Sequence, residues 1–398
     1  MSKREPKIRF RGFTDEWEQR KLGDEVQIIM GQSPSSENYT DNPSDHILVQ
    51  GNADMKNGYV FPRLWTTQVT KQAVKGDLIL SVRAPVGDIG KTDYDVVLGR
   101  GVSAIKGNEF IFQQLGKMKL DGYWAKYSTG STFESINSND IKTATIFSPN
   151  MKEQNKIGLL FKVMDNLITA RQKQLDLLKE QKKGFLQKMF PKAGETVPEI
   201  RFAGFADDWK QRKLGDLASS FEYGLNASAT EYDGENKYIR ITDIDDSSHG
   251  FIQSGLTSPN TDLTAEENYL LREGDVLFAR TGASVGKTYH YKVEDGHIYY
   301  AGFLIRARIR PDFDSEFVFQ NTVTAKYENF ICVTSQRSGQ PGVNAQEYAK
   351  FELSVPSLSE QRKIGHFFEK IDNTITLHQQ KVDILKELKR GFLQQMFI

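Results

Sequence analysis

The sequence predicts an α+β fold in which two related α/β domains alternate with two long helices that pair as an antiparallel coiled coil. Two observations carry this prediction: residues 149–190 return as residues 356–397, and residues 6–24 return as residues 198–216. Because both repeats flank a variable middle in the same order, the repeated unit is a globular part followed by a helix, which makes the chain a pseudo-twofold repeat. The expected boundaries are 1–148 for the first domain, 149–190 for the central helix, 191–355 for the second domain and 356–398 for the second helix.

Each domain opens with the same aromatic run. PKIRFRGFTDEWEQRKLGD at 6–24 and PEIRFAGFADDWKQRKLGD at 198–216 share 14 of 19 residues. We expect Trp17 and Trp209 to lie in a core or in a domain contact, because their spacing is held while the middles diverge. Stacking of these rings on nucleic-acid bases is the alternative.

The variable middles read as short strands followed by a helix. Alternating apolar runs bounded by Gly, Asp, Asn and Ser predict the strands. Apolar periodicity predicts helices near 110–127 and 314–332. The predicted strands are DHILVQG (45–51), NGYVFP (57–62) and GDLILSVR (76–83) in the first domain, and NKYIRITDI (236–244), HGFIQ (249–253), GDVLFAR (274–280) and YYAGFLIRARIR (299–310) in the second.

The two helical repeats carry apolar residues at alternating steps of four and three, the pattern of a coiled-coil seam. One step of each seam is polar, Arg171 or His378, and a polar seam residue lowers stability but fixes register. A proline-free helix of about 30 residues is roughly 45–50 Å long. Two surface helices packed on separate cores are the alternative. The predicted pairing residues are Ile157, Phe161, Met164, Ile168, Arg171, Leu175, Leu178, Ile364, Phe368, Ile371, Ile375, His378, Val382 and Leu385.

Composition excludes several classes of protein. The 398 residues are 38% apolar and 26% charged, as in ordinary globular proteins, and no apolar run approaches the roughly 18 residues of a membrane span. A single cysteine, Cys332, excludes an internal disulfide and suits a reducing cytoplasm. The histidines include no pair three or four positions apart, so we expect no metal site.

Charge is balanced overall but distributed unevenly. The chain holds 52 Lys and Arg against 52 Asp and Glu, which gives no general attraction to nucleic acid. Residues 151–190 hold nine basic and four acidic residues, a net charge of +5. Residues 191–355 hold 17 basic and 25 acidic residues, a net charge of −8. Any surface that binds nucleic acid must therefore be local.

The candidate catalytic motifs do not match their templates. A phosphate-binding loop needs four residues between its glycine and the Gly-Lys pair. GASVGKT at 282–288 has three, and PVGDIGKT at 85–92 is equally irregular. Glu235 and Lys237 only loosely match a nuclease triplet, and no methyl-transfer motif is present. Both Gly-Lys stretches are better interpreted as a strand ending in a tight turn that displays two cations, Arg83 and Lys91 in the first domain and Arg280 and Lys287 in the second.

What remains is a binding architecture. Two related modules on a helical support resemble proteins that read two DNA half-sites about 34–36 Å apart. Arginine reads guanine, Asn and Gln read adenine, and Ser or Thr read either. A protein-interaction scaffold is the main alternative, and a nuclease or NTPase that depends on Lys237 or Lys287 is a third. The candidate DNA-binding residues are Gln50, Asn52, Arg83, Lys91, Ser128, Thr129 and Ser131 in the first domain, and Arg240, Thr242, Arg280, Thr281, Lys287, Gln336, Arg337, Ser338 and Gln340 in the second.

The whole chain resembles the specificity subunit of type I restriction-modification systems. The most specific marks are KKGFLQKMF at 182–190 and its copy at 389–397. Three further motifs also resemble that family: W-x-Q-R-K-L-G-D at the start of each domain, P-x-x-x-E-Q before each helix at Pro149 and Pro356, and SGQPGVN at 338–344. The corresponding stretch of the first domain, STFESIN at 131–137, lacks the Ser-Gly-Gln sequence that is usual in the family.

The resemblance implies a division of labour among subunits. Such a chain carries no catalysis and binds no cofactor or metal. Each domain reads one half of a bipartite double-stranded DNA sequence, and the helices set the spacer. The helices also recruit two modification subunits, which methylate adenine with S-adenosylmethionine. A restriction subunit, an ATP- and Mg-dependent translocase and nuclease, joins this cytoplasmic complex, which needs no membrane.

Overall fold

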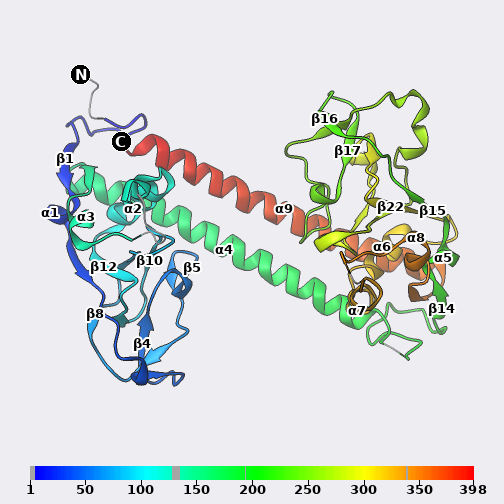
Figure 1. Ribbon diagram of the computed structural model, residues 1–398, viewed down its shortest axis with the longest axis horizontal. Helices are drawn as coiled ribbons and strands as arrows, with labels where there is room; N and C mark the ends of the chain where they lie inside the picture. The colour runs from blue at the N-terminus through cyan, green and yellow to red at the C-terminus, as the bar shows by residue number, and fades with distance from the viewer. Residues whose placement is uncertain (1–4, 128–134, 193, 338) are drawn as a thin grey trace. The chain divides into compact units, whose positions relative to one another are not determined.

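The computed structural model describes residues 5–127, 135–192, 194–337 and 339–398 and divides into two compact units (Figure 1). The first unit comprises Met1–Gln172 and Lys381–Ile398. The second is the continuous stretch Lys173–Gln380. Each unit therefore contains one globular domain together with part of both long helices.

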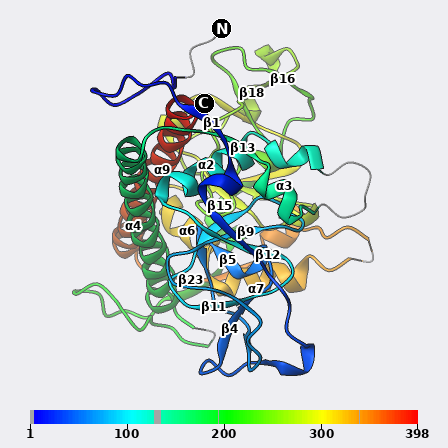
Figure 2. The same ribbon diagram turned by 90° about the vertical axis from the view of Figure 1, so that its left-hand side faces the viewer.

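The long helices are α4 (Met151–Met189) and α9 (Leu358–Met396), each within two residues of the predicted bounds. In the first unit Lys389, late in α9, pairs with Asp165, early in α4, at 2.6 Å. In the second unit Lys182, late in α4, pairs with Asp372, early in α9, at 2.7 Å. Figures 1 and 2 both show the two helices side by side within the units. The predicted antiparallel pairing is confirmed.

The seam residues are the buried face of each helix. Eight of them are fully buried: Ile157, Phe161, Met164, Leu175, Ile364, Phe368, Ile375 and Val382. Ile168, Leu178, Ile371 and Leu385 are partly buried, as are the polar seam residues Arg171 and His378. The role of the two polar residues in fixing register stays a prediction.

The first unit is built around two sheets, which face the viewer in Figure 2. One sheet has the order β2-β12-β9-β10-β6-β5 and the other β3-β7-β4-β11-β8, while β1 pairs with β13. The strands are β1 (Glu18–Lys21), β2 (Gln27–Met30), β3 (Tyr39–Thr40), β4 (His46–Val49), β5 (Met55–Lys56), β6 (Tyr59–Val60), β7 (Trp65–Thr66), β8 (Lys71–Ala73), β9 (Leu78–Ser81), β10 (Ile89–Lys91), β11 (Val96–Leu98), β12 (Val102–Lys106) and β13 (Thr145–Ser148). The shorter helices are α1 (Leu22–Glu25), α2 (Glu109–Leu120) and α3 (Ser138–Lys142).

The second unit repeats this plan. Its main sheet has the order β15-β22-β19-β20, and β14-β23, β16-β18 and β17-β21 form pairs. The strands are β14 (Lys210–Lys213), β15 (Ala218–Tyr223), β16 (Ala229–Glu231), β17 (Lys237–Ile239), β18 (Thr257–Pro259), β19 (Asp275–Ala279), β20 (Thr288–His290), β21 (Ile298–Tyr300), β22 (Leu304–Ile309) and β23 (Glu352–Val355). The helices are α5 (Leu214–Leu217), α6 (Ser315–Asn321), α7 (Ala325–Thr334) and α8 (Ala345–Tyr348).

The strand order shows which parts of the two units correspond. β2-β12-β9-β10 and β15-β22-β19-β20 are both antiparallel, and each unit also has a parallel pair, β4 with β11 and β17 with β21. One predicted strand is wrong: residues 249–253 contribute only an isolated bridge between Phe251 and Ile244. This stretch lies in a tight turn, where Asp245 accepts hydrogen bonds from Ser247 and Ser248 and His249 has a positive φ of 55°.

Each core is closed by the aromatic end of the helix that comes from the other repeat. In the first unit Phe397 stacks on Phe110 at 5.0 Å between ring centroids and lies 6.2 Å from Trp17. In the second unit Phe190 stacks on Phe317 at 5.6 Å and lies 6.3 Å from Trp209. The two tryptophans are 1% and 2% exposed. Their predicted core role is confirmed, and such burial excludes base stacking on them.

A chain of polar side chains joins each domain to both helices. In the first unit Lys91 pairs with Glu109 at 2.6 Å, and Gln113 donates to Glu109 and to Asp165, which in turn binds Lys389. The same chain in the second unit consists of His290, Glu316, Gln320, Asp372 and Lys182. Because buried polar groups require partners with defined geometry, this chain fixes the orientation of the domain on the helices.

Candidate nucleic-acid interface

A polar cavity of about 330 Å³ gathers three of the predicted residues in the first unit. Gln50 and Asn52 follow β4, and Arg83 follows β9. The turn after β11 adds Arg100. Long-range strand pairing thus brings two amides and two guanidinium groups to one site. The full lining is Ser33, Tyr39, Gln50, Gly51, Asn52, Ser81, Arg83, Ala84, Arg100 and Gly101.

Hydrogen bonds hold the amide side of this cavity in place. Gln50 donates its side-chain amide to the Tyr39 hydroxyl at 2.6 Å, and its backbone N–H donates to Asp54 at 2.7 Å. Asp54 is buried and pairs with Arg63 at 2.9 Å. A Cβ on Gly101 would lie 2.1 Å from the Gln50 carbonyl oxygen, so only glycine fits there. The loop is therefore preorganised, and none of the described residues donates a hydrogen bond to the Gln50 side-chain oxygen, which can act as an acceptor.

The two arginines supply the donors. Arg83 and Arg100 are both exposed, and in the described part of the chain neither guanidinium has a hydrogen-bond or ion-pair partner. Sequence reasoning missed Arg100; the available signal was its position between Gly99 and Gly101 directly after a buried strand. The predicted Ser128, Thr129 and Ser131 lie outside the described residues.

The second unit brings three predicted residues together at the corresponding place. Thr281 bridges to Gly342, and the N–H of Gly282 donates to the Pro341 carbonyl at 3.0 Å. The Gln340 amide nitrogen lies 3.0 Å from the position that a Cβ on Gly282 would take. Arg280, Thr281 and Gln340 therefore lie on two adjoining loops.

Aromatic rings flank the Arg280 guanidinium. Its central carbon lies 5.1 Å from the Tyr223 ring centroid and 5.7 Å from that of Phe303, a cation–π arrangement. The Arg280 Nε is buried and has no hydrogen-bond partner among the described residues. Phe303 is 59% exposed, and sequence reasoning missed it because it reads as one more apolar residue of a strand.

Other predicted residues already have intramolecular partners. Arg240 pairs with Asp243 at 2.8 Å, a hydrogen bond that raises the Arg240 pKa, and Thr242 also donates to Asp243. Arg337 pairs with Glu347 at 2.5 Å. Gln336 is exposed, and Ser338 lies outside the described residues.

The two turn lysines are expected to be displayed on the surface, but the structure shows both in contacts within the chain. Lys91 binds Glu109 and is 15% exposed, whereas Lys287 binds Asp246 and the Ile244 carbonyl and is 12% exposed. Neither ammonium is free to reach a partner molecule without giving up these contacts.

The two Gly-Lys motifs are not equivalent in three dimensions. Strand register pairs Lys91 with Leu78, but the residue at that position in the second unit is His290, which pairs with Val276. Likewise Arg83 bridges Ser135 as Thr281 bridges Gly342, so Arg83 corresponds to Thr281 and not to Arg280. Eight residues separate the paired Leu80 and Ile89 and nine separate Phe278 and Thr288, and Lys287 falls three residues before the position that corresponds to Lys91.

Neither a membrane span nor a metal centre is found in the ranges that the structure describes. None of the helices there combines the length and the apolar content needed to cross a bilayer. The same ranges contain no group of three or more His, Cys, Asp and Glu side chains placed to hold a metal ion.

Comparisons with known proteins agree with the repeated architecture. The family model for the type I restriction modification DNA specificity domain matches residues 14–180 and 206–387. The MjaX type I restriction enzyme specificity subunit of Methanocaldococcus jannaschii is 33% identical over 177 residues, which cover 42% of this chain and 41% of that protein. The MjaVIII specificity subunit of the same organism is 20% identical over 95% of this chain and 91% of its own length.

Two solved structures share the fold. The type I restriction-modification S subunit from M. genitalium superposes with a TM-score of 0.69 at 14% identity, covering 99% of both chains. A second chain, from a study of complex assembly in a type I restriction-modification system, gives a TM-score of 0.50 at 16% identity over 96% of this chain and 97% of its own. With one specificity-domain match in each repeat, this chain belongs to the type I restriction modification DNA specificity family.

Proposed function

We propose that this chain is the specificity subunit of a type I restriction-modification complex and that each domain reads one half of a bipartite double-stranded DNA sequence. The observation that carries the proposal is the family match, which occurs once in each repeat. Its physical support is that each domain carries arginine and amide side chains on adjoining loops, although Arg83 and Arg280 do not occupy equivalent positions.

The two clusters suit direct readout of bases in the major groove. An arginine binds guanine through O6 and N7, and an amide binds adenine through N6 and N7. In the first domain Arg83, Asn52 and the Gln50 oxygen take these roles. In the second domain Arg280 and Gln340 take them, while Phe303 provides apolar contact to a thymine methyl group.

The helices set the spacer and dock the modification subunits. In the first unit α4 exposes apolar residues at steps of four, Leu159, Val163 and Leu167, and α9 exposes Ile384 and Leu388. Exposed apolar stripes of this kind mark contact surfaces, and their spacing suits partner helices.

Catalysis belongs to partner subunits in this proposal. S-adenosylmethionine, ATP and Mg²⁺ bind to the modification and restriction subunits, and this chain binds none of them. The lysines that an NTPase or a nuclease would use support this assignment, because Lys287 binds Asp246 and Lys237 binds the Asp295 carbonyl at 2.7 Å.

A domain exchange tests the proposal. Residues 25–148 are replaced by those of a relative, and methylated adenines are mapped in cells that carry the complete system. We expect one half of the methylated sequence to change and the other half to persist. An unchanged sequence, or a change in both halves, contradicts the assignment of one half-site to each domain.

A helix insertion tests the spacer. Four residues inserted after Asp176 and after its counterpart Asp383 add one turn to both helices, about 6 Å. At about 3.4 Å per base pair, the unspecified spacer should lengthen by roughly two base pairs while both half-sites stay the same. The alternative function, a protein scaffold that does not read DNA, predicts equal binding to motif and scrambled duplexes at matched salt.

A further inference from the structure

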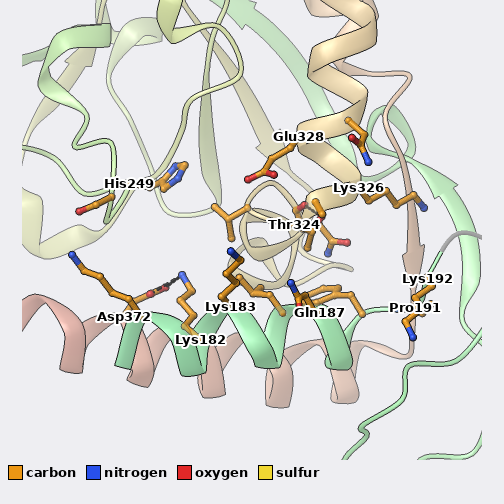
Figure 3. A pocket seen from close by; sticks show the side chains of 18 of the residues that line it. Lys182, Lys183, Gln187, Pro191, Lys192, His249, Thr324, Lys326, Glu328 and Asp372 are labelled. Carbon is orange, nitrogen blue, oxygen red and sulfur yellow. Dashed lines mark hydrogen bonds and ion pairs between the residues drawn. The ribbon is translucent and has the colours of Figure 1, made fainter. Parts of the chain in front are cut away.

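The second unit contains a cavity of about 880 Å³ that the base-reading clusters do not use (Figure 3). It lies between the C-terminal half of α4, the start of α7 and the loop that carries His249. Its volume is within the range of ligand sites. Five lysines line it, Lys179, Lys182, Lys183, Lys192 and Lys326, against two carboxylates, Glu328 and Asp372.

Two of these lysines have no polar partner among the described residues. Lys182 is directed to Asp372, the ion pair drawn in Figure 3. Lys183 and Lys326 have no hydrogen-bond or ion-pair partner in the part of the chain that the structure describes. In Figure 3 Lys183 rises from α4 on the side that faces Thr324. Burial lowers the pKa of Lys326, with Glu352 opposing this effect, so its ammonium lacks full hydration.

The start of α7 adds further donors. Thr324 caps this ten-residue helix, and the N–H groups of Tyr327 and Glu328 bond to the Thr324 carbonyl. The N–H groups of Ala325 and Lys326, both on the cavity wall, have no such bond among the described residues. Free amides and the positive end of a helix favour an anion at this position.

Across the cavity, Ser247 and Ser248 line the rim, and both donate their hydroxyl hydrogens to Asp245. Burial alone would raise the pKa of Asp245, but hydrogen bonds from Ser248 and Ser247 bring it to about 2. The carboxylate therefore fixes both serines at the rim. The donors that match the oxygens of a phosphate group are therefore the lysine ammonium groups and the free amides of α7.

The first unit has a different arrangement at this position. Its α2 continues to Leu120, so no new helix starts there, and Lys119, which is 207 positions before Lys326, forms an ion pair with Asp88. The unpaired Lys326 is therefore a feature of the second unit, whose residues 191–355 carry a net charge of −8, whereas Arg390, 207 positions after Lys183, also has no hydrogen-bond or ion-pair partner among the described residues.

We propose that this cavity is a phosphate-binding site that holds a backbone phosphate of the DNA read by the second domain. The inference rests on the proposed function. An acidic domain repels DNA, and here the cations come chiefly from α4, whose residues 151–190 carry a net charge of +5. The site adds affinity without sequence preference, because a phosphate is the same in every nucleotide.

The test uses the full chain assembled with its modification subunits. Lys183→Gln, Lys326→Gln and the double variant are compared with Lys173→Gln, a matched loss of charge at an exposed position of α4 that does not line the cavity. Fluorescence anisotropy measures the Kd for a duplex that carries the methylated motif and for a scrambled duplex, across a series of salt concentrations.

We expect the double variant to bind both duplexes on the order of tenfold more weakly, by the same factor, with the slope of log K against log salt reduced by about 0.9, the value for one neutralised phosphate. Lys173→Gln should leave the slope unchanged. Unchanged affinity and slope in the double variant, or a loss confined to the motif duplex, overturns the proposal. An unchanged melting temperature of the second unit confirms that the variants fold.

Two further outcomes separate the hypotheses. If the complex without any substitution binds the motif duplex and the scrambled duplex equally, the proposed function fails, whatever the lysine variants do. If ATP or inorganic phosphate saturates the DNA-free complex, and the double variant abolishes that binding while DNA affinity persists, the site serves a free phosphate compound and the DNA assignment is overturned.

Discussion

Replacing Phe397 with alanine should destabilise the first unit and spare the second. Phe397 is 3% exposed and packs on Phe110 at 5.0 Å, on Phe161 at 5.7 Å and on Trp17 at 6.2 Å. Truncation of a buried phenylalanine costs about 3–5 kcal/mol, because apolar burial is lost and a cavity remains. A domain is stable by about 5–15 kcal/mol, so the variant should lose roughly a fifth or more of that stability.

The measurement is differential scanning calorimetry combined with limited proteolysis, which identifies the unit that unfolds. For units of this size, about 2–4 °C per kcal/mol predicts a fall of roughly 6–20 °C in one transition. Phe190→Ala is the matched variant, since Phe190 stacks on Phe317 at 5.6 Å, and it should lower the other transition. Phe303→Ala, at an exposed ring, should change neither by more than about 0.5 kcal/mol. If Phe397→Ala and Phe190→Ala lower the same transition, the assignment of each helix end to a separate core is wrong.

Three further predictions concern charge and assembly. Arg201→Ala should lower the free energy of unfolding in urea by about 3–5 kcal/mol, because it leaves the buried Glu360 carboxylate unpaired. Combining Arg201→Ala with Glu360→Gln should recover part of that loss. Equal stability of the original chain, the single variant and the double variant would refute this prediction. The pKa of Asp245 is about 2 in the folded chain, below its usual value. Its stabilising contribution is therefore present near neutral pH and is lost as the pH falls from about 5 toward 2. Asp245→Asn should flatten that part of the curve of unfolding free energy against pH. Leu159→Ser with Val163→Ser should weaken co-purification of the modification subunits while the melting temperatures hold, and undiminished assembly would exclude this stripe as their contact surface.

The repeats made the helices predictable. A four-three seam is a local pattern repeated many times, so α4 and α9 begin and end within two residues of expectation. The strand GDLILSVR was equally clear, because its apolar run is bounded by turn residues, and it became β9. In both cases a single stretch of sequence contains all the information that determines the element.

The candidate sites depended on contacts that no local pattern contains. Arg100 reaches the first cluster because β11 pairs in parallel with β4, and Lys91 is withdrawn because Glu109 lies beside it on α2. The apparent match of Lys91 with Lys287 failed because strand register gives the position of Lys91 to His290, three residues after Lys287. Pairing between distant strands, and not residue type, decided which cations are available.

The division of the chain into units has a consequence for synthesis. The second unit is continuous in sequence, whereas the first needs Lys381–Ile398 to complete it. A ribosome adds residues in order, so every residue of the second core is in place before Leu393, Met396 and Phe397 exist. The N-terminal domain, although synthesised first, is therefore completed last. Trp17 and Phe110 lack the Phe397 ring until the whole second unit has been synthesised. Translation speed and chaperone access should consequently matter more for the N-terminal domain than for the one that follows it.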